Sequence, residues 1–229
     1  MNHRAVVFDL FGTLVPPFPR AEHTKAVEQT AGILGLDFEF CHALWGSSYE
    51  RRIAGEFTAM AEYFAWFGEQ AGVAVSGTAC GEAAAVYAEF ARESIQPLPG
   101  VVETLAAIAA SGRTIGLLTN CTPDVAELFP ETSMGRYFSS TTFSSVAGVV
   151  KPSPESYGRV LRGLGVEPSE VLYVGDGSDG ELSGAQAAGM TAVLVTPSLH
   201  NTYDQHRPEV EAWGGVRIAT IPEVLELLS

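Results

Sequence analysis

Four polar positions, far apart in the sequence, each stand where an apolar segment ends. They are Asp9 after RAVVF, Thr119–Asn120 after TIGLL, Lys151 after SSVAGVV, and Asp176 after VLYVG. A carboxylate held at a strand end can attack phosphorus, and two carboxylates with water and a substrate phosphate suit Mg²⁺. Each position alone could instead be a turn, a helix cap or a solvated lysine. Their occurrence together, in this order, favours a catalytic site.

The surrounding segments predict how these positions meet. Residues 4–10 form a short apolar strand, and from about residue 94 onward strands and helices alternate, which predicts βαβ units and a parallel sheet. Predicted strands follow at 114–120, 137–143, 170–176 and 191–196, with helices at 102–112, 123–129, 153–165, 181–189 and 222–228. Ligands bind beyond the carboxyl ends of the strands in such sheets. We therefore predict an α/β, Rossmann-like core made of residues 1–16 and 94–229.

The segment between the first strand and the rest has a different character. Residues 17–93 contain no convincing strand, and four helical stretches end near glycine or a polar break. They cover residues 21–35, 40–55, 57–72 and 81–95. The sequence therefore predicts an all-α unit inserted into the core, with the aromatic residues of 57–72 forming its interior.

Composition limits the possible partners. The formal net charge of −14 argues against nucleic acid, whose binding depends on Lys and Arg, but a bound cation could still attract a small anion. No apolar run is long enough to span a bilayer. The three cysteines form no CxxC pattern, and the N-terminus enters a strand at once. We expect a protein of a reducing compartment, by default the cytoplasm, with a small-molecule substrate and an oligomeric state left open.

Several segments resemble the motifs of a known family. FDLFGTLV, LLTN, VVKPSPESY and VGDGSDGELSGAQAAGM, together with PLPGVVETL, are similar to the haloacid dehalogenase superfamily of hydrolases, most of which are phosphatases. The resemblance covers nearly the whole chain. It implies a Rossmann-like core with a helical cap inserted after the first motif.

The resemblance also implies a role for each polar position. Asp9 would be the nucleophile that forms an aspartyl-phosphate. Thr119 and the backbone of Asn120 would bind the oxygens of the transferred group. Lys151 would balance charge on the nucleophile and on the phosphoryl group.

A Mg²⁺ ion is implied beside the nucleophile. Its ligands would be Asp9, Asp176 and a backbone carbonyl near Phe11, since Mg²⁺ needs few carboxylates. Glu181 stands where the fourth motif usually shows its second acid, and Asp179 is the alternative.

One position departs from the phosphatase pattern. The phosphatases of the family carry a second Asp two residues after the nucleophile, where it protonates the leaving alcohol; this chain has Phe11. Such assistance is typically worth about 10²–10⁴ in rate. Dehalogenases of the family carry an aromatic residue there and use no metal. Phosphonatases keep the metal and use a cap lysine, but Lys25 has Glu22 and Glu28 beside it and is better explained as a surface pair.

The fourth motif favours the Mg²⁺-dependent members of the family over the metal-free dehalogenases. Without a cation between them, the neighbouring carboxylates of Asp9 and Asp176 would repel each other. The preferred function is a Mg²⁺-dependent phosphatase of a small phosphorylated metabolite. Two alternatives remain: a 2-haloacid dehalogenase that forms an ester on Asp9, and a weakly active or non-catalytic ligand-binding descendant.

The helical unit should supply substrate contacts. Of the two consecutive arginines, Arg51 is preferred over Arg52 as the anion-binding residue, because only one can face the site. His23 is better explained as an ordinary surface residue, and the polar segment 200–215 receives no role.

Overall fold

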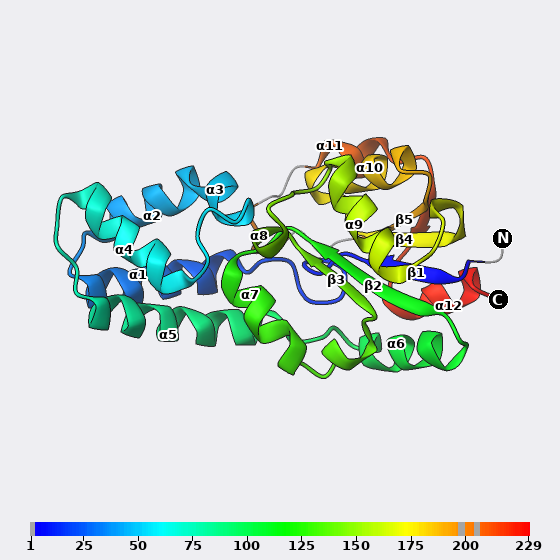
Figure 1. The fold of residues 1–229 in the computed structure, drawn as a ribbon, viewed down its shortest axis with the longest axis horizontal. Helices are drawn as coiled ribbons and strands as arrows, with labels where there is room; N and C mark the ends of the chain where they lie inside the picture. Colours follow the sequence, from blue (N-terminus) through cyan, green and yellow to red (C-terminus); the bar gives the residue numbers. More distant parts are fainter. Residues whose placement is uncertain (1–2, 197–199, 204–206) are drawn as a thin grey trace.

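The computed structural model describes residues 3–196, 200–203 and 207–229. A helical bundle lies at one end of an elongated molecule, and a sheet flanked by helices lies at the other, with both termini at the sheet end (Figure 1). Among the described residues, no helix is both long and apolar enough to cross a membrane.

The sheet has six parallel strands in the order β3-β2-β1-β4-β5-β6. The strands are β1 (Ala5–Phe8), β2 (Thr114–Thr119), β3 (Ser140–Phe143), β4 (Val171–Gly175), β5 (Thr191–Val195) and β6 (Val216–Ile218). Strand β1 is central, and its four residues are fully buried. The predicted α/β class and parallel sheet are confirmed.

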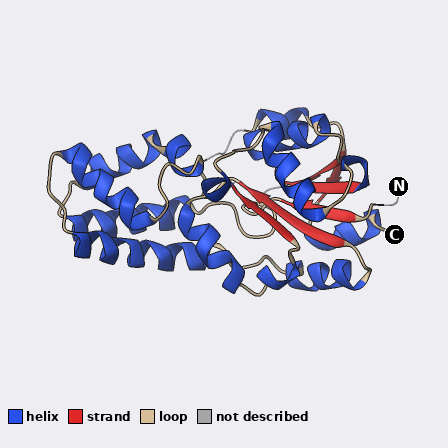
Figure 2. Cartoon of the chain, in the orientation of Figure 1, coloured by secondary structure: helices blue, strands red, loops and turns tan. Residues whose placement is uncertain are grey.

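Helices cover both faces of the sheet (Figure 2). They are α6 (Val101–Ala110), α7 (Pro123–Leu128), α8 (Ser144–Ala147), α9 (Pro154–Leu164), α10 (Glu181–Ala187), α11 (Pro208–Ala212) and α12 (Val224–Leu227). Alternate residues of β1 enter different cores: Val6 and Phe8 pack with residues of α6 and α12, and Val7 packs with residues of α9 and α10. A strand buried on both faces explains the continuous apolar run that predicted it.

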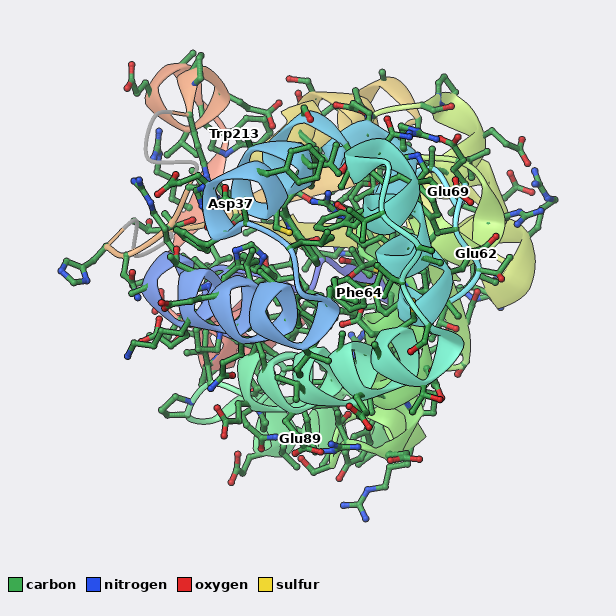
Figure 3. The ribbon with its side chains drawn as sticks, turned by 90° about the vertical axis from the view of Figure 1, so that its left-hand side faces the viewer. Asp37, Glu62, Phe64, Glu69, Glu89 and Trp213 are labelled. Carbon is green, nitrogen blue, oxygen red and sulfur yellow. The ribbon has the colours of Figure 1, made fainter. Side chains whose placement is uncertain are left out.

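The bundle between β1 and β2 has a core of its own. It consists of α1 (Arg20–Leu34), α2 (Phe38–Ser47), α3 (Tyr49–Ile53), α4 (Met60–Ala71) and α5 (Gly77–Ser94). Figure 3 looks onto its end: Phe64 lies between the helices, and Glu62, Glu69 and Glu89 lie on the outside. The aromatic residues of α4 therefore pack inward.

Three sequence-based expectations need correction. The helix expected at 40–55 is two helices, because the chain breaks at Ser48, whose hydroxyl donates to the Leu44 carbonyl. The bundle thus has five helices rather than four. Strand β6 and helix α11 were not predicted, since both are short and β6 is largely exposed. The last helix begins with a 3₁₀ turn at residues 221–223.

Candidate active site

The polar positions meet at the carboxyl edge of the sheet. Asp9 follows β1 directly, Thr119 ends β2, and Asp176 follows β4, which is the other neighbour of β1. The register pairs Phe8 with Leu117 and with Val174, so the three strands end at nearly the same level. The fold therefore gathers residues that lie more than a hundred positions apart in the chain.

Lys151 joins two of the acids. Its Nζ donates to Asp9 Oδ1 at 2.6 Å and to Glu181 Oε2 at 2.5 Å, and all three side chains are buried. Thr13 Oγ1 donates to the other Asp9 oxygen at 3.1 Å. The nucleophile candidate is thus held in one orientation by a hydroxyl and an ammonium group.

Burial sets the proton affinity of this cluster. It raises the pKa of Asp9 and raises the pKa of Glu181 to about 8, although Lys151 opposes both shifts. Burial lowers the pKa of Lys151, but the charges of Asp9 and Glu181 outweigh it, and the net shift is well upward. Burial thus disfavours the ionised form of both acids beside a single lysine, so additional positive charge at this position would stabilise their ionised forms.

A third acid completes a set suited to a divalent cation. Oxygens of Asp9, Asp176 and Glu181 all lie within 4.8 Å of one another. Asp176 Oδ2 is buried and accepts no hydrogen bond of good geometry from the described residues. Gly12, at φ +79°, leaves room for it, because a Cβ there would lie 1.8 Å from this oxygen. Hard oxygen ligands in such a set fit Mg²⁺.

Both oxygens of Glu181 already have donors. Oε1 accepts from the Gly177 N–H at 2.9 Å, and Oε2 accepts from Tyr173 as well as from Lys151. Glu181 is therefore better placed to orient Lys151 than to give up an oxygen to a metal. Asp179, the alternative acid, instead accepts from Asn120 Nδ2 at 2.7 Å.

Arg207 places a guanidinium group beside the third acid. Its Nη1 forms an ion pair with Asp176 Oδ2 and donates to the Asp176 carbonyl at 3.2 Å. Asp176 therefore has a positive charge beside it even without a metal, because the Arg207 guanidinium supplies part of the charge balance. Sequence reasoning gave segment 200–215 no role. The position of that segment after the carboxyl end of β5 was the signal that could have identified it.

Asn120 connects two loops of the site. Its Oδ1 accepts from the Lys151 N–H at 2.8 Å, and its Nδ2 donates to the Lys151 carbonyl at 3.3 Å. The side chain therefore positions the lysine, and only the backbone of Asn120 remains for a ligand. Thr119 is buried and lines the same cavity as Asp9.

A cavity of about 570 Å³ lies over Asp9, between the sheet and the bundle. This size is within the range of about 300–1,000 Å³ that is usual for small-molecule sites. Its floor includes Asp9, Thr119 and Lys151, and Phe11 lines it as well. The bundle contributes His23, Trp45, Arg52 and Tyr87, and the late segment contributes Tyr203 and Arg207.

The structure places Arg52, and not the preferred Arg51, in the lining of the cavity. Arg51 is partly exposed and does not line the cavity; it pairs with Glu56, and its Cζ lies 4.4 Å from the centroid of the Trp66 ring. Arg52 is 3% exposed, lines the cavity, and donates to Ser48 and Tyr63. The break at Ser48 starts a new helix, so the direction of each arginine could not be extrapolated from the preceding turn.

His23 also differs from expectation, because it is buried in the cavity wall rather than at the surface. Its Nδ1 lies 2.8 Å from the Tyr203 hydroxyl. Burial, assisted by the charge of Arg52, lowers the pKa of His23 to about 3, so its ring is neutral at physiological pH.

Comparisons with known proteins agree with this geometry. A family model described as "haloacid dehalogenase-like hydrolase" matches residues 3–189. The chain is 39% identical over 111 residues to a phosphoglycolate phosphatase of Salmonella typhimurium, covering 48% of this chain and 44% of that protein. It is 36% identical over 127 residues to the phosphoglycolate phosphatase of Escherichia coli K12, covering 54% and 50%. These alignments span about half of the relatives' length.

Solved structures share the fold. A HAD phosphatase from Thermococcus onnurineus superposes with a TM-score of 0.69 at 22% identity, covering 100% of this chain and 98% of that one. An L-2-haloacid dehalogenase from Xanthobacter autotrophicus gives 0.64 at 19% identity, covering 99% and 98%. At these identities the likeness concerns the fold alone.

Proposed function

The chain belongs to the haloacid dehalogenase-like hydrolases, and we propose that it is a Mg²⁺-dependent phosphatase of a small phosphorylated metabolite. The observation that carries the proposal is the buried cluster of Asp9, Asp176 and Lys151 at the base of a cavity large enough for a metabolite. The partial likeness to phosphoglycolate phosphatases supports the same reaction class.

The reaction begins at Asp9. One of its oxygens attacks phosphorus, the bond from phosphorus to the ester oxygen breaks, and the leaving oxygen departs with the electron pair. Water then hydrolyses the aspartyl-phosphate to release phosphate and restore Asp9. Lys151 holds the carboxylate in place and offsets charge on the phosphoryl oxygens.

The remaining roles follow from position. Asp9 and Asp176 would hold Mg²⁺, with the Phe11 carbonyl as a further ligand and Glu181 as a more distant support. When bound, Mg²⁺ would supply positive charge to the transferring phosphoryl group. Thr119 and the Asn120 backbone would bind phosphoryl oxygens.

The helical bundle would act as a cap over the substrate. Arg52, rather than Arg51, would contact an anionic group of the bound molecule. The three cysteines are free and buried, which fits a reducing compartment such as the cytoplasm.

A panel of phosphorylated metabolites tests the proposal. With Mg²⁺ present, the protein should release phosphate from at least one of them, and a chelator should abolish the release. Asp9→Asn should reduce turnover by at least about 10³-fold, because it removes the nucleophile. Acid quenching during turnover should trap phosphate on Asp9. Release that persists in the Asp9→Asn variant would exclude the mechanism.

A second candidate is a metal-free 2-haloacid dehalogenase. Phe11 and the ion pair between Arg207 and Asp176 favour it, because a halide needs no general acid and the guanidinium balances the second carboxylate. Halide release from 2-chloropropionate, unaffected by a chelator and without phosphatase activity, would establish this function instead.

A further inference from the structure

One wall of the cavity over Asp9 is built from aromatic rings. Phe11, Phe18, Trp45, Tyr87 and Tyr203 all line it. Phe18 lies at the centre of one side, with its ring centroid 5.6 Å from that of Phe11 and 6.5 Å from that of Tyr203. Trp45 and Tyr87 lie 4.7 Å apart on the other side. The rings come from four separate parts of the chain, which are the loop after β1, helix α2, helix α5 and the segment 200–203, so the wall forms only in the folded protein.

His23 lies between the Phe18 part and the Trp45 part of this aromatic wall. Its ring centroid lies 5.1 Å from that of Phe18 and 4.9 Å from that of Trp45. The side chain is 1% exposed, and its Nε2 has no hydrogen-bond partner among the described residues. A buried nitrogen without a partner is costly unless a ligand satisfies it. The wall therefore combines a mainly apolar surface with a histidine nitrogen that has no partner among the described residues.

Phe11 connects the wall to the chemistry. Its ring occupies the position that would hold the general acid, so the ester oxygen must leave without a proton from this residue. An aromatic hydroxyl has a pKa near 10, as in tyrosine, and its anion leaves far more readily than an alkoxide. The same side chain thus favours a substrate with a good leaving group and contributes to a surface that binds rings.

We propose, as an extension of the phosphatase function, that the natural substrate is a phosphate ester of an aromatic hydroxyl. Asp9 attacks phosphorus, the bond to the aryl oxygen breaks, and the phenolate leaves with the electron pair and takes a proton from water. The ring of the substrate packs against Phe11 and Phe18, and His23 Nε2 contacts a polar substituent. A molecule as small as phosphoglycolate would leave most of the 570 Å³ cavity unfilled.

Three phosphate esters distinguish the effect of an aromatic ring on binding from the effect of a good leaving group. They are phenyl phosphate, benzyl phosphate and methyl phosphate, each assayed with saturating Mg²⁺. We expect kcat/KM for phenyl phosphate to exceed that for benzyl phosphate by about 10²-fold or more, because no acid assists the alkoxide. Benzyl phosphate should exceed methyl phosphate by about tenfold, through ring contacts. Nitrophenyl esters are unsuitable, because most phosphatases cleave them.

Variants test which residue is responsible for the preference for an aryl leaving group and which is responsible for the preference for a ring. Phe11→Asp should narrow the ratio between phenyl and benzyl phosphate by supplying an acid. Phe18→Leu should narrow the ratio between benzyl and methyl phosphate. Phe40→Leu is the matched control, since Phe40 is partly buried in the bundle core and does not line the cavity, and it should change neither ratio.

A binding measurement makes the test independent of turnover. Calorimetry with Mg²⁺ should show tighter binding of phenylphosphonate than of methylphosphonate by about tenfold, and Phe18→Leu should remove the difference. Similar kcat/KM values for the three esters, or equal binding of the two phosphonates, would overturn the aryl-ester proposal while leaving a phosphatase. Absence of phosphate release from every ester and every metabolite would instead remove the phosphatase function.

Discussion

At the scale of single residues, Arg51 and Arg52 allow a matched comparison, because two adjacent arginines lie in different environments. Arg52 lines the cavity, and Arg51 pairs with Glu56 outside it. Arg52→Gln should raise KM for a phosphorylated substrate by about 10- to 100-fold, the loss expected for a hydrogen bond to a charged group. Arg51→Gln should change KM less than about twofold, since exposed pairs contribute little. Steady-state kinetics of both variants and of Arg52→Lys measures this. Equal effects of both substitutions would contradict the assignment.

Arg207 allows a second test at this scale. Its guanidinium lies against the oxygen of Asp176 that a metal would use, so the two cations compete. Arg207→Gln should therefore bind Mg²⁺ about tenfold more tightly, because a nearby like charge is removed. Isothermal titration calorimetry reports the affinity without turnover. Arg92→Gln, an exposed arginine paired with Glu89, should leave the affinity unchanged. Weaker Mg²⁺ binding would show that Arg207 instead orients Asp176.

At the scale of elements, the strands were the most predictable part of the chain. Apolar runs such as β1 and β4 end directly before Asp9 and Asp176, and parallel strands end at one edge, so their meeting follows from the pattern. The direction of Arg52 and the burial of His23 did not follow. Both depend on how the bundle helices pack on one another, and for His23 also on the distant Tyr203, and these contacts leave no local pattern in the sequence.

Helix α7 carries a buried acid where it contacts α5. Asp124 is 5% exposed, and neither of its oxygens has a hydrogen bond of good geometry among the described residues, although the Thr122 hydroxyl lies close enough to lower its pKa somewhat. Burial outweighs this and raises the pKa of Asp124 from 3.8 to about 6. The folded state therefore binds this proton more tightly than the unfolded state. The stability that it contributes is present below about pH 4 and is lost as pH rises through 6.

Asp124→Asn should remove the free-energy cost of ionising a buried carboxyl group, which the wild type bears increasingly as pH rises through 6. At pH 7.5 the variant should be more stable than the wild type by up to about 3 kcal/mol, since one pKa unit corresponds to about 1.4 kcal/mol. The difference should shrink toward pH 4.5. Urea denaturation at pH 4.5, 6.0 and 7.5 measures the free energy of unfolding. Glu127→Gln, an exposed acid on the same helix, is the control. A less stable variant at pH 7.5 would mean that the Asp124 charge is used in the fold.

At the scale of the whole molecule, the formal net charge of −14 repels an anionic substrate, whereas three cationic side chains that line the cavity attract it. An anionic substrate must approach a negatively charged protein before it meets Lys151, Arg52 and Arg207. The Debye length falls from about 30 Å at 0.01 M salt to about 10 Å at 0.1 M, so salt screens the distant acids more than the nearby cations.

Added salt should therefore help the substrate to bind. With Mg²⁺ saturating, kcat/KM for a phosphorylated substrate should rise about two- to fivefold between 10 and 200 mM KCl. Initial rates at low substrate concentration measure this, and choline chloride in place of KCl separates screening from specific ion effects. Arg52→Gln should steepen the rise, because it removes a local attraction. A fall in kcat/KM with salt would show that the cations at the cavity outweigh the net charge of the protein.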